Sequence, residues 1–94
     1  RPDVVRIGQA MKPIKLSRHA RENMAFRGTT EEEIVDAIRT SEWQPSELGR
    51  LEVRKDFPYN HSWNGKLYAT KRVRPIFVDE TAAIVVVTVY VYYF

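Results

Sequence analysis

The stretch Ala83-Ile84-Val85-Val86-Val87-Thr88-Val89-Tyr90-Val91-Tyr92-Tyr93 decides the fold. Nearly all of its residues are β-branched or aromatic, and such side chains favour strands. The residues are apolar at both sets of alternating positions, which is typical of a strand that is covered on both faces. We therefore predict that residues 83–93 form a central strand of a sheet.

Alternation along this strand assigns its side chains to two faces of the sheet. The face expected to point toward the core carries Val85, Val87, Val89 and Val91. The face expected to point the other way carries Ile84, Val86, Thr88, Tyr90 and Tyr92.

Other strands are expected earlier in the chain. Arg50 to Phe57 alternates polar and apolar residues, and Lys66 to Val78 is a longer strand-like run. Pro58 to Gly65 lies between them, is rich in turn-forming residues and is predicted to be a loop. Lys12 to Leu16 is predicted to be a short edge strand, because a proline is tolerated at an edge. Gln44 to Gly49 is predicted to be a turn.

A first helix is predicted over Arg18 to Arg27. Ser17 is a good N-cap for it, and Gly28 stands where a helix commonly ends. Within this helix His19 lies in the first turn.

A second helix is predicted from Thr30 to about Thr40. Thr30 and Glu33 have the spacing of a capping box, in which each side chain binds a free backbone amide of the first turn. The acidic run Glu31–Glu33 also suits the positive end of the helix dipole, so it needs no catalytic or metal-binding role. The order of elements predicts an α+β fold, with two N-terminal helices packed on one face of a three- to four-stranded antiparallel sheet.

The length of 94 residues indicates one domain. We expect residues 1–11 to be a flexible N-terminal arm and residues 12–94 to be the domain. The chain has no cysteine, and His19 and His61 do not have the spacing of zinc ligands, so neither a metal nor a cofactor is expected. There is no apolar run of about 20 residues, and we expect a cytoplasmic protein with no membrane partner.

A net charge of +3 and a pI of about 9.4 favour an anionic partner. If the strand registers match, one sheet face gathers cations, aromatics and a hydroxyl. The members of this basic sheet face are Arg54, Arg72, Arg74, Tyr68, Thr88 and Tyr90. Guanidinium groups bind phosphate and tyrosines stack on bases, so such a face suits RNA. The other interpretation is an ordinary solvated sheet face, on which arginine and tyrosine are common.

The candidate for acid–base chemistry is His19, because histidine titrates near neutral pH. The competing interpretation is that His19 only packs or caps at the start of its helix. His61, beside Trp63 in the predicted loop, is expected to be structural or incidental; the alternative is that this loop borders a nucleic-acid site.

The run Leu16-Ser17-Arg18-His19-Ala20-Arg21-Glu22-Asn23-Met24-Ala25-Phe26-Arg27-Gly28-Thr29-Thr30-Glu31-Glu32-Glu33-Ile34 resembles the start of a family of small domains. The shared pattern is a His-Ala, then a Met, an Arg-Gly and a capped second helix. Val85 to Tyr90 is similar to the last strand of that family, and the resemblance covers roughly Lys15 to Tyr93. The family is placed with the RelE-like toxins of the barnase–EndoU–colicin–RelE fold.

This resemblance implies a metal-independent ribonuclease, often the toxin of a toxin–antitoxin pair. We expect an endoribonuclease that cleaves RNA by attack of the ribose 2′-OH. The expected catalytic residues are His19, Arg54, Arg72 and Tyr90, and the expected substrate-binding residues are Arg74, Tyr68 and Thr88. The expected partners are RNA, including ribosome-bound mRNA, and an acidic antitoxin protein. The alternative is a non-catalytic module that binds RNA or protein through the basic sheet face.

Overall fold

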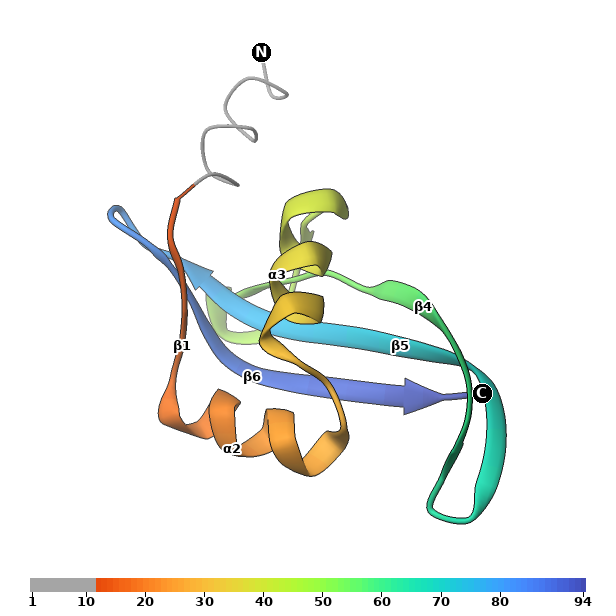
Figure 1. The fold of residues 1–94 in the computed structure, drawn as a ribbon. Coiled ribbons are helices and arrows are strands. Elements are labelled where there is room, and N and C mark those ends of the chain that lie inside the picture. The colour runs from red at the N-terminus through yellow and green to blue at the C-terminus, as the bar shows by residue number, and fades with distance from the viewer. Residues whose placement is uncertain (1–11) are drawn as a thin grey trace.

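Two helices lie on the same face of one sheet in the computed structural model, which describes residues 12–94 (Figure 1). The arm expected over residues 1–11 lies outside the described residues. The elements, in chain order, are β1 (Ile14–Leu16), α2 (Arg18–Arg27), α3 (Glu31–Thr40), β2 (Gln44–Pro45), a 3-10 turn (Glu47–Gly49), β3 (Leu51–Glu52), β4 (Lys55–Trp63), β5 (Lys66–Asp79) and β6 (Ile84–Tyr93).

Both helices begin as their sequences predict. Ser17 Oγ accepts a hydrogen bond from the backbone of Ala20 at 3.1 Å, and α2 ends at Gly28 in the left-handed conformation. At α3, the Thr30 hydroxyl and the Glu33 carboxylate form both bonds of the capping box. These caps satisfy backbone groups that a helix end would otherwise leave unpaired.

The sheet differs from the predicted three- to four-stranded antiparallel sheet. Residues 12–94 form a six-stranded sheet in the order β1-β6-β5-β3-β2, and β4 also pairs with β5. β1 runs parallel to β6, so the sheet is mixed. The prediction was wrong because the β1–β6 pairing joins segments about 70 residues apart in the chain (Ile14 with Ile84), for which alternation gives no signal. The fold remains α+β.

The most extensively paired strand is β5 rather than β6. β5 pairs with β6 on one side and with β3 and β4 on the other, whereas β6 meets β1 only over Ile84–Val86. The predicted strand Arg50–Phe57 is interrupted between β3 and β4. The predicted loop Pro58–Gly65 is mostly strand: β4 continues to Trp63, with a register shift after Pro58.

A bulge in β6 changes which side chains face the core. Ile76 pairs with Thr88 and the next residue, Phe77, pairs with Val86, so Val87 is an extra residue in β6. Consequently Ile84 and Val86 join Val89 in the buried core, on the helix side, and not on the face that strict alternation predicts. Beyond the bulge, Thr88, Tyr90 and Tyr92 keep their predicted face, opposite the helices.

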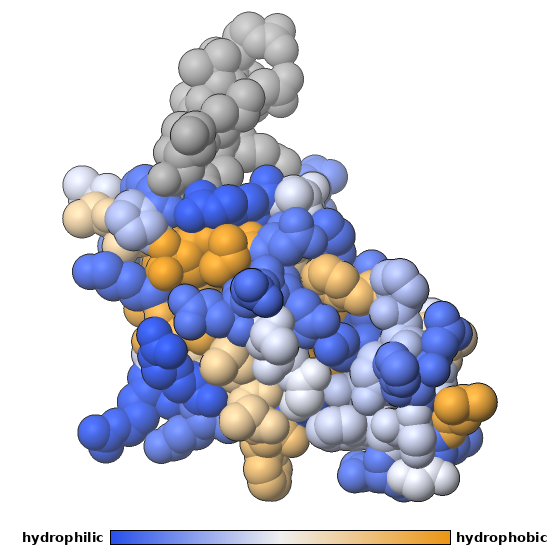
Figure 2. All heavy atoms as spheres, in the orientation of Figure 1, coloured by the Kyte–Doolittle hydropathy of each residue, from blue (hydrophilic) through white to orange (hydrophobic). Residues whose placement is uncertain are grey.

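The core lies between the helices and the sheet. Its buried apolar members are Leu16, Ala20, Ile34, Ala37, Ile38, Val53, Val73, Phe77, Ile84, Val86 and Val89. In the view of Figure 1, hydrophilic side chains cover most of the surface and hydrophobic atoms show in separate patches (Figure 2). The apolar stripe of α3, Ile34, Ala37 and Ile38, packs against the sheet, whereas α2 buries only Ala20.

Lys71 of β5 ties both helices to the sheet from within this layer. Its Nζ lies 2.9 Å from Oε2 of Glu33 and donates to the carbonyl of Gly28 at 3.1 Å. The other carboxylate oxygen of Glu33 accepts from the Thr29 hydroxyl and the Thr30 amide. One lysine thus fixes the end of α2 and the start of α3.

We predict that Gly28→Ala strongly destabilises the fold. Gly28 has a φ of +84°, and an added Cβ would lie 2.5 Å from the Tyr93 hydroxyl and 2.7 Å from the Trp63 ring. The left-handed conformation costs a non-glycine residue about 1–2 kcal/mol, and overpacking adds about 1–3 kcal/mol. The free energy of unfolding from urea denaturation measures the loss.

Gly49→Ala is the matched control. Gly49 has a φ of +72° but no atom within 4 Å of an added Cβ. Gly49→Ala should therefore lower the free energy of unfolding only by the conformational cost. Equal losses of free energy in the two variants would contradict the close packing at Gly28.

Candidate functional site

His19, Asn23 and Arg27 follow one another at successive turns of α2 and meet β6. Asn23 Nδ2 lies 2.8 Å from Nε2 of His19 and donates to the Thr88 hydroxyl at 3.2 Å. Asn23 Oδ1 accepts from Nε of Arg27 at 3.3 Å. Because the amide oxygen is used by Arg27, the amide nitrogen faces His19, whose Nε2 then acts as the acceptor. The neutral His19 ring therefore carries its proton on Nδ1, and the residue is exposed.

Tyr90 lies next to this helix face and contacts two arginines. The Arg27 guanidinium carbon is 5.1 Å from the centroid of the Tyr90 ring, and that of Arg74 is 5.4 Å from it. Both distances are within the range of cation–π attraction. Tyr90 thereby joins a cation from the helix to a cation from β5.

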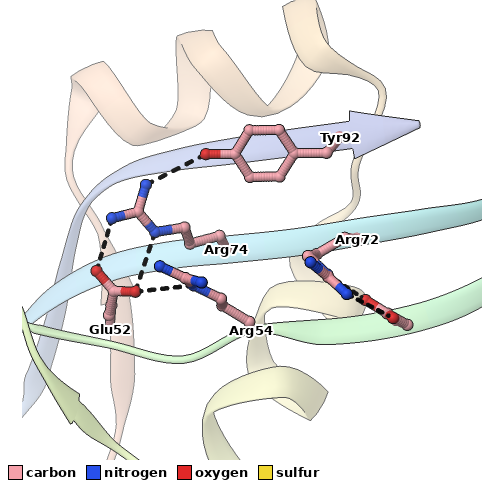
Figure 3. A network of polar contacts seen from close by, with 6 residues as sticks. Glu52, Arg54, Arg72, Arg74 and Tyr92 are labelled. Atoms are coloured by element: carbon pink, nitrogen blue, oxygen red, sulfur yellow. Dashed lines mark hydrogen bonds and ion pairs between the residues drawn. The ribbon is translucent and has the colours of Figure 1, made fainter. Parts of the chain in front are cut away.

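Glu52 organises the arginines of the sheet face (Figure 3). Arg74 binds both carboxylate oxygens, at 2.7 and 3.1 Å, and Arg54 Nε binds one of them at 3.1 Å. Arg74 also donates to the Tyr92 hydroxyl at 3.2 Å. Glu52 is buried, and the hydrogen bond from Arg74 holds its pKa at about 2. The carboxylate is therefore ionised at neutral pH and serves to position cations.

A hollow of about 520 Å³ opens beside this carboxylate. It is lined by Glu42, Gln44, Pro45, Glu52 and Arg54. Arg54 uses only Nε toward Glu52 and its side chain is 58% exposed. The terminal nitrogens of Arg54 thus remain accessible from solvent.

Arg72 binds a different carboxylate. Its Nε and Nη2 donate to the two oxygens of Asp56, at 2.6 and 3.1 Å, and its guanidinium lies over the Phe94 ring. The hydrogen bond from Arg72 lowers the pKa of Asp56. A bidentate pair of this kind uses most of the directional donors of a guanidinium. Arg72 therefore forms a pair of its own, adjacent to the Glu52 cluster.

The structure brings together most of the residues predicted from the sequence. The contacts above join His19, Thr88, Tyr90, Arg74 and Arg54 into one network. Arg72 has its own carboxylate. Tyr68 instead contacts Tyr93 and Lys66, within an aromatic group near the β4–β5 hairpin. The sequence prediction missed Asn23, Arg27, Glu52 and Tyr92.

A simple signal could have identified two of these. Asn23 and Arg27 follow His19 at intervals of four residues, so they lie on the same side of a helix. Glu52 alternates with Arg54, but its burial and its two arginine partners depend on the register of β3 with β5. His61 is exposed and contacts the Tyr59 ring edge-on, away from the His19 network.

Within residues 12–94, no three histidine or acidic side chains are grouped so that they could hold a metal ion. The helices in this part of the chain are also too short or too polar to cross a membrane. No protein-family model, curated protein or solved structure matches the chain. Function is therefore inferred from the geometry of the site.

We predict that Glu52→Gln weakens the fold at neutral pH and flattens its response to acid. The folded-state pKa of about 2 lies below the ordinary value of 4.5, so Glu52 stabilises the fold above about pH 4.5. That stabilisation is lost as the pH falls toward about 2. Removing one partner of a buried ion pair costs about 3–5 kcal/mol.

Urea denaturation at several pH values between 6 and 2 measures both effects. The wild-type free energy of unfolding should fall more steeply than that of the variant between pH 4.5 and pH 2. Parallel curves would show that the Glu52 carboxylate is not held by Arg74 in solution.

Proposed function

We propose that this chain is a metal-independent endoribonuclease whose site lies where α2 meets the outer face of β5 and β6. The observation that carries the proposal is the hydrogen-bonded chain from His19 through Asn23 to Thr88 and Arg27, with Tyr90 and Arg74 beside it. A histidine, two hydroxyls and several guanidiniums are the groups that metal-free RNA cleavage uses.

In the proposed reaction the ribose 2′-OH attacks the adjacent phosphorus and the 5′-oxygen departs. His19 can take the 2′-OH proton at Nδ1 when the ring's own proton is on Nε2, and the Asn23 amide then turns its oxygen toward Nε2 to accept a hydrogen bond from it. The Nδ1–H of the resulting imidazolium protonates the departing 5′-oxygen. Asn23 is therefore a positioning residue for His19 rather than a catalytic one.

Arg27 is the proposed phosphate clamp. Its terminal nitrogens make no hydrogen bond or ion pair within residues 12–94, so both of these donor nitrogens are available for phosphate oxygens. Arg54 can add a second cation from the exposed side of Glu52. Arg74 is already bound by Glu52, which leaves it the role of fixing the tyrosines beside the phosphate.

Under this proposal the substrate is RNA, either free or as ribosome-bound mRNA, and the chain acts in the cytoplasm as the toxin of a toxin–antitoxin pair. An acidic antitoxin would neutralise it by covering Arg27 and Arg54. The resemblance of residues 16–34 to RelE-like toxins supports this setting.

A second candidate function is RNA binding without cleavage. It is favoured by the two carboxylates of the face, because Glu52 and Asp56 already occupy Arg74 and Arg72. Paired in this way, the two guanidiniums give less charge stabilisation to a transition state, whereas Arg27 can still bind a phosphate. The two candidate functions share the Arg27 site and differ in whether His19 transfers a proton.

We predict that His19→Ala lowers the rate of RNA cleavage by roughly 10²–10⁴-fold, the usual contribution of general acid–base catalysis. End-labelled RNA is incubated with purified protein in EDTA, and products are resolved on a gel. His61→Ala is the control, since His61 is exposed and lies outside the network. If wild type binds RNA and yields no product, the binding function replaces the catalytic one.

We predict that Arg27→Gln weakens RNA binding and makes it less sensitive to salt. Loss of one phosphate contact should reduce the slope of log affinity against log salt by about 1. Fluorescence anisotropy with a labelled oligonucleotide measures the slope. Arg39→Gln, an exposed change on α3, should leave it unaltered. A normal slope for Arg27→Gln would remove Arg27 from the interface.

A further inference from the structure

A second, smaller hollow lies between the end of α2 and the strands β4 and β6. It has a volume of about 240 Å³ and is lined by Phe26, Arg27, Trp63, Val91 and Tyr93. Pockets for drug-sized ligands have volumes of ~300–1,000 Å³. The smaller volume of this hollow suits a single small ring system. None of the five lining residues is acidic. Arg27 belongs both to this hollow and to the proposed phosphate site.

One wall of the hollow is a fixed aromatic pair. The rings of Trp63 and Tyr93 are stacked, with centroids 4.7 Å apart and planes 19° from parallel. The Tyr93 hydroxyl donates to the carbonyl of Arg27 at 2.8 Å. Burial raises the pKa of Tyr93 to about 12, so this donor keeps its proton at neutral pH. The wall is thus held in place before any ligand arrives.

Phe26 is an open aromatic surface at the same hollow. The residue is 83% exposed, and it directly precedes Arg27 in the last turn of α2. An aromatic ring left in water beside a cation gains little for the fold. The same arrangement serves single-stranded nucleic acid well, because bases stack on aromatic rings while cations bind the backbone.

The backbone of β6 adds polar groups to the hollow. Along an antiparallel strand, residues whose N–H and C=O point at the partner strand alternate with residues whose groups point away from it. Phe94 exchanges both backbone hydrogen bonds with Thr70 of β5, so the N–H and C=O of Val91, three residues earlier, point away from β5. On that side, β6 has a partner strand among residues 12–94 only as far as Val86, and the Ser17 hydroxyl donates to the next carbonyl, that of Val87. Val91 therefore presents one backbone donor and one backbone acceptor at the pocket wall. The polar edge of a nucleobase can form hydrogen bonds with both.

We propose that this hollow, the Phe26 pocket, binds one nucleobase of the RNA while Arg27 binds its phosphate. The base stacks on Phe26, with the Trp63–Tyr93 pair as the fixed wall of the pocket, and its polar edge meets the peptide groups of Val91. The proposal rests on the proposed function, because Arg27 links the base to the phosphate at the His19 network. In this proposal the aromatic side chains select which nucleotide lies beside the cleaved bond.

The test uses a labelled 2′-O-methyl heptanucleotide, which cannot be cleaved by 2′-OH attack, and an abasic heptanucleotide with the same backbone. Anisotropy is measured for wild type, Phe26→Ala and Leu48→Ala. Leu48 is 85% exposed in the 3-10 turn, so Leu48→Ala is a matched loss of an exposed apolar side chain. Circular dichroism verifies that each variant is folded.

Phe26→Ala should weaken binding of the complete oligonucleotide by about 5–100-fold, the usual effect of removing one stacking ring. It should leave binding of the abasic oligonucleotide unchanged, and Leu48→Ala should change neither. In a Trp43→Phe background, the complete oligonucleotide should also quench the emission of Trp63.

Two results would overturn the Phe26 pocket while leaving the proposed function in place. One is equal binding of the complete oligonucleotide by wild type and Phe26→Ala, with Arg27→Gln still weakened. The other is an equal loss for the abasic oligonucleotide, which would mean that no base is contacted. If wild type binds neither oligonucleotide at low salt, the proposed function fails and the pocket assignment fails with it.

Discussion

The ion pair between Lys71 and Glu33 is the constraint on which the arrangement of the helices depends. Lys71 is only 9% exposed, and a buried ammonium is tolerated only when charge and hydrogen bonds compensate for lost water. Glu33 supplies the charge and the Gly28 carbonyl supplies a further acceptor. Because these partners stand at the end of α2 and the start of α3, the pair fixes the turn between the helices. It thereby fixes where α2 runs along β6.

The path of α2 creates the candidate site. The helix packs Ala20 against the sheet, and its neighbouring side places Asn23 and Arg27 at the edge of β6. They can reach Thr88 and Tyr90 on the far face because β1 pairs with β6 only up to Val86. A longer β1 would close that edge with backbone hydrogen bonds. The short edge strand thus leaves open both the His19 network and the Phe26 pocket.

The sheet face is an ion-pair network as much as a basic surface. Glu52 and Asp56 hold Arg74, Arg54 and Arg72 in defined orientations, which reduces the entropy lost when the face binds a ligand. The same carboxylates reduce the charge available to phosphate. Under the function we propose, affinity for RNA depends most on Arg27, whose terminal nitrogens have no hydrogen-bond or ion-pair partner in the part of the chain described.

The sequence by itself determined the features whose signals are local. The capping residues Ser17 and Thr30 predicted where the helices start, and alternation predicted the long strands β5 and β6 and the face of Thr88 and Tyr90. Only the tertiary structure decided the parallel pairing of β1, the bulge at Val87 and the binding of arginines by Glu52 and Asp56. Capping and alternation act over a few residues, whereas pairing register and buried ion pairs join segments distant in the chain and depend on which contacts the folded core permits.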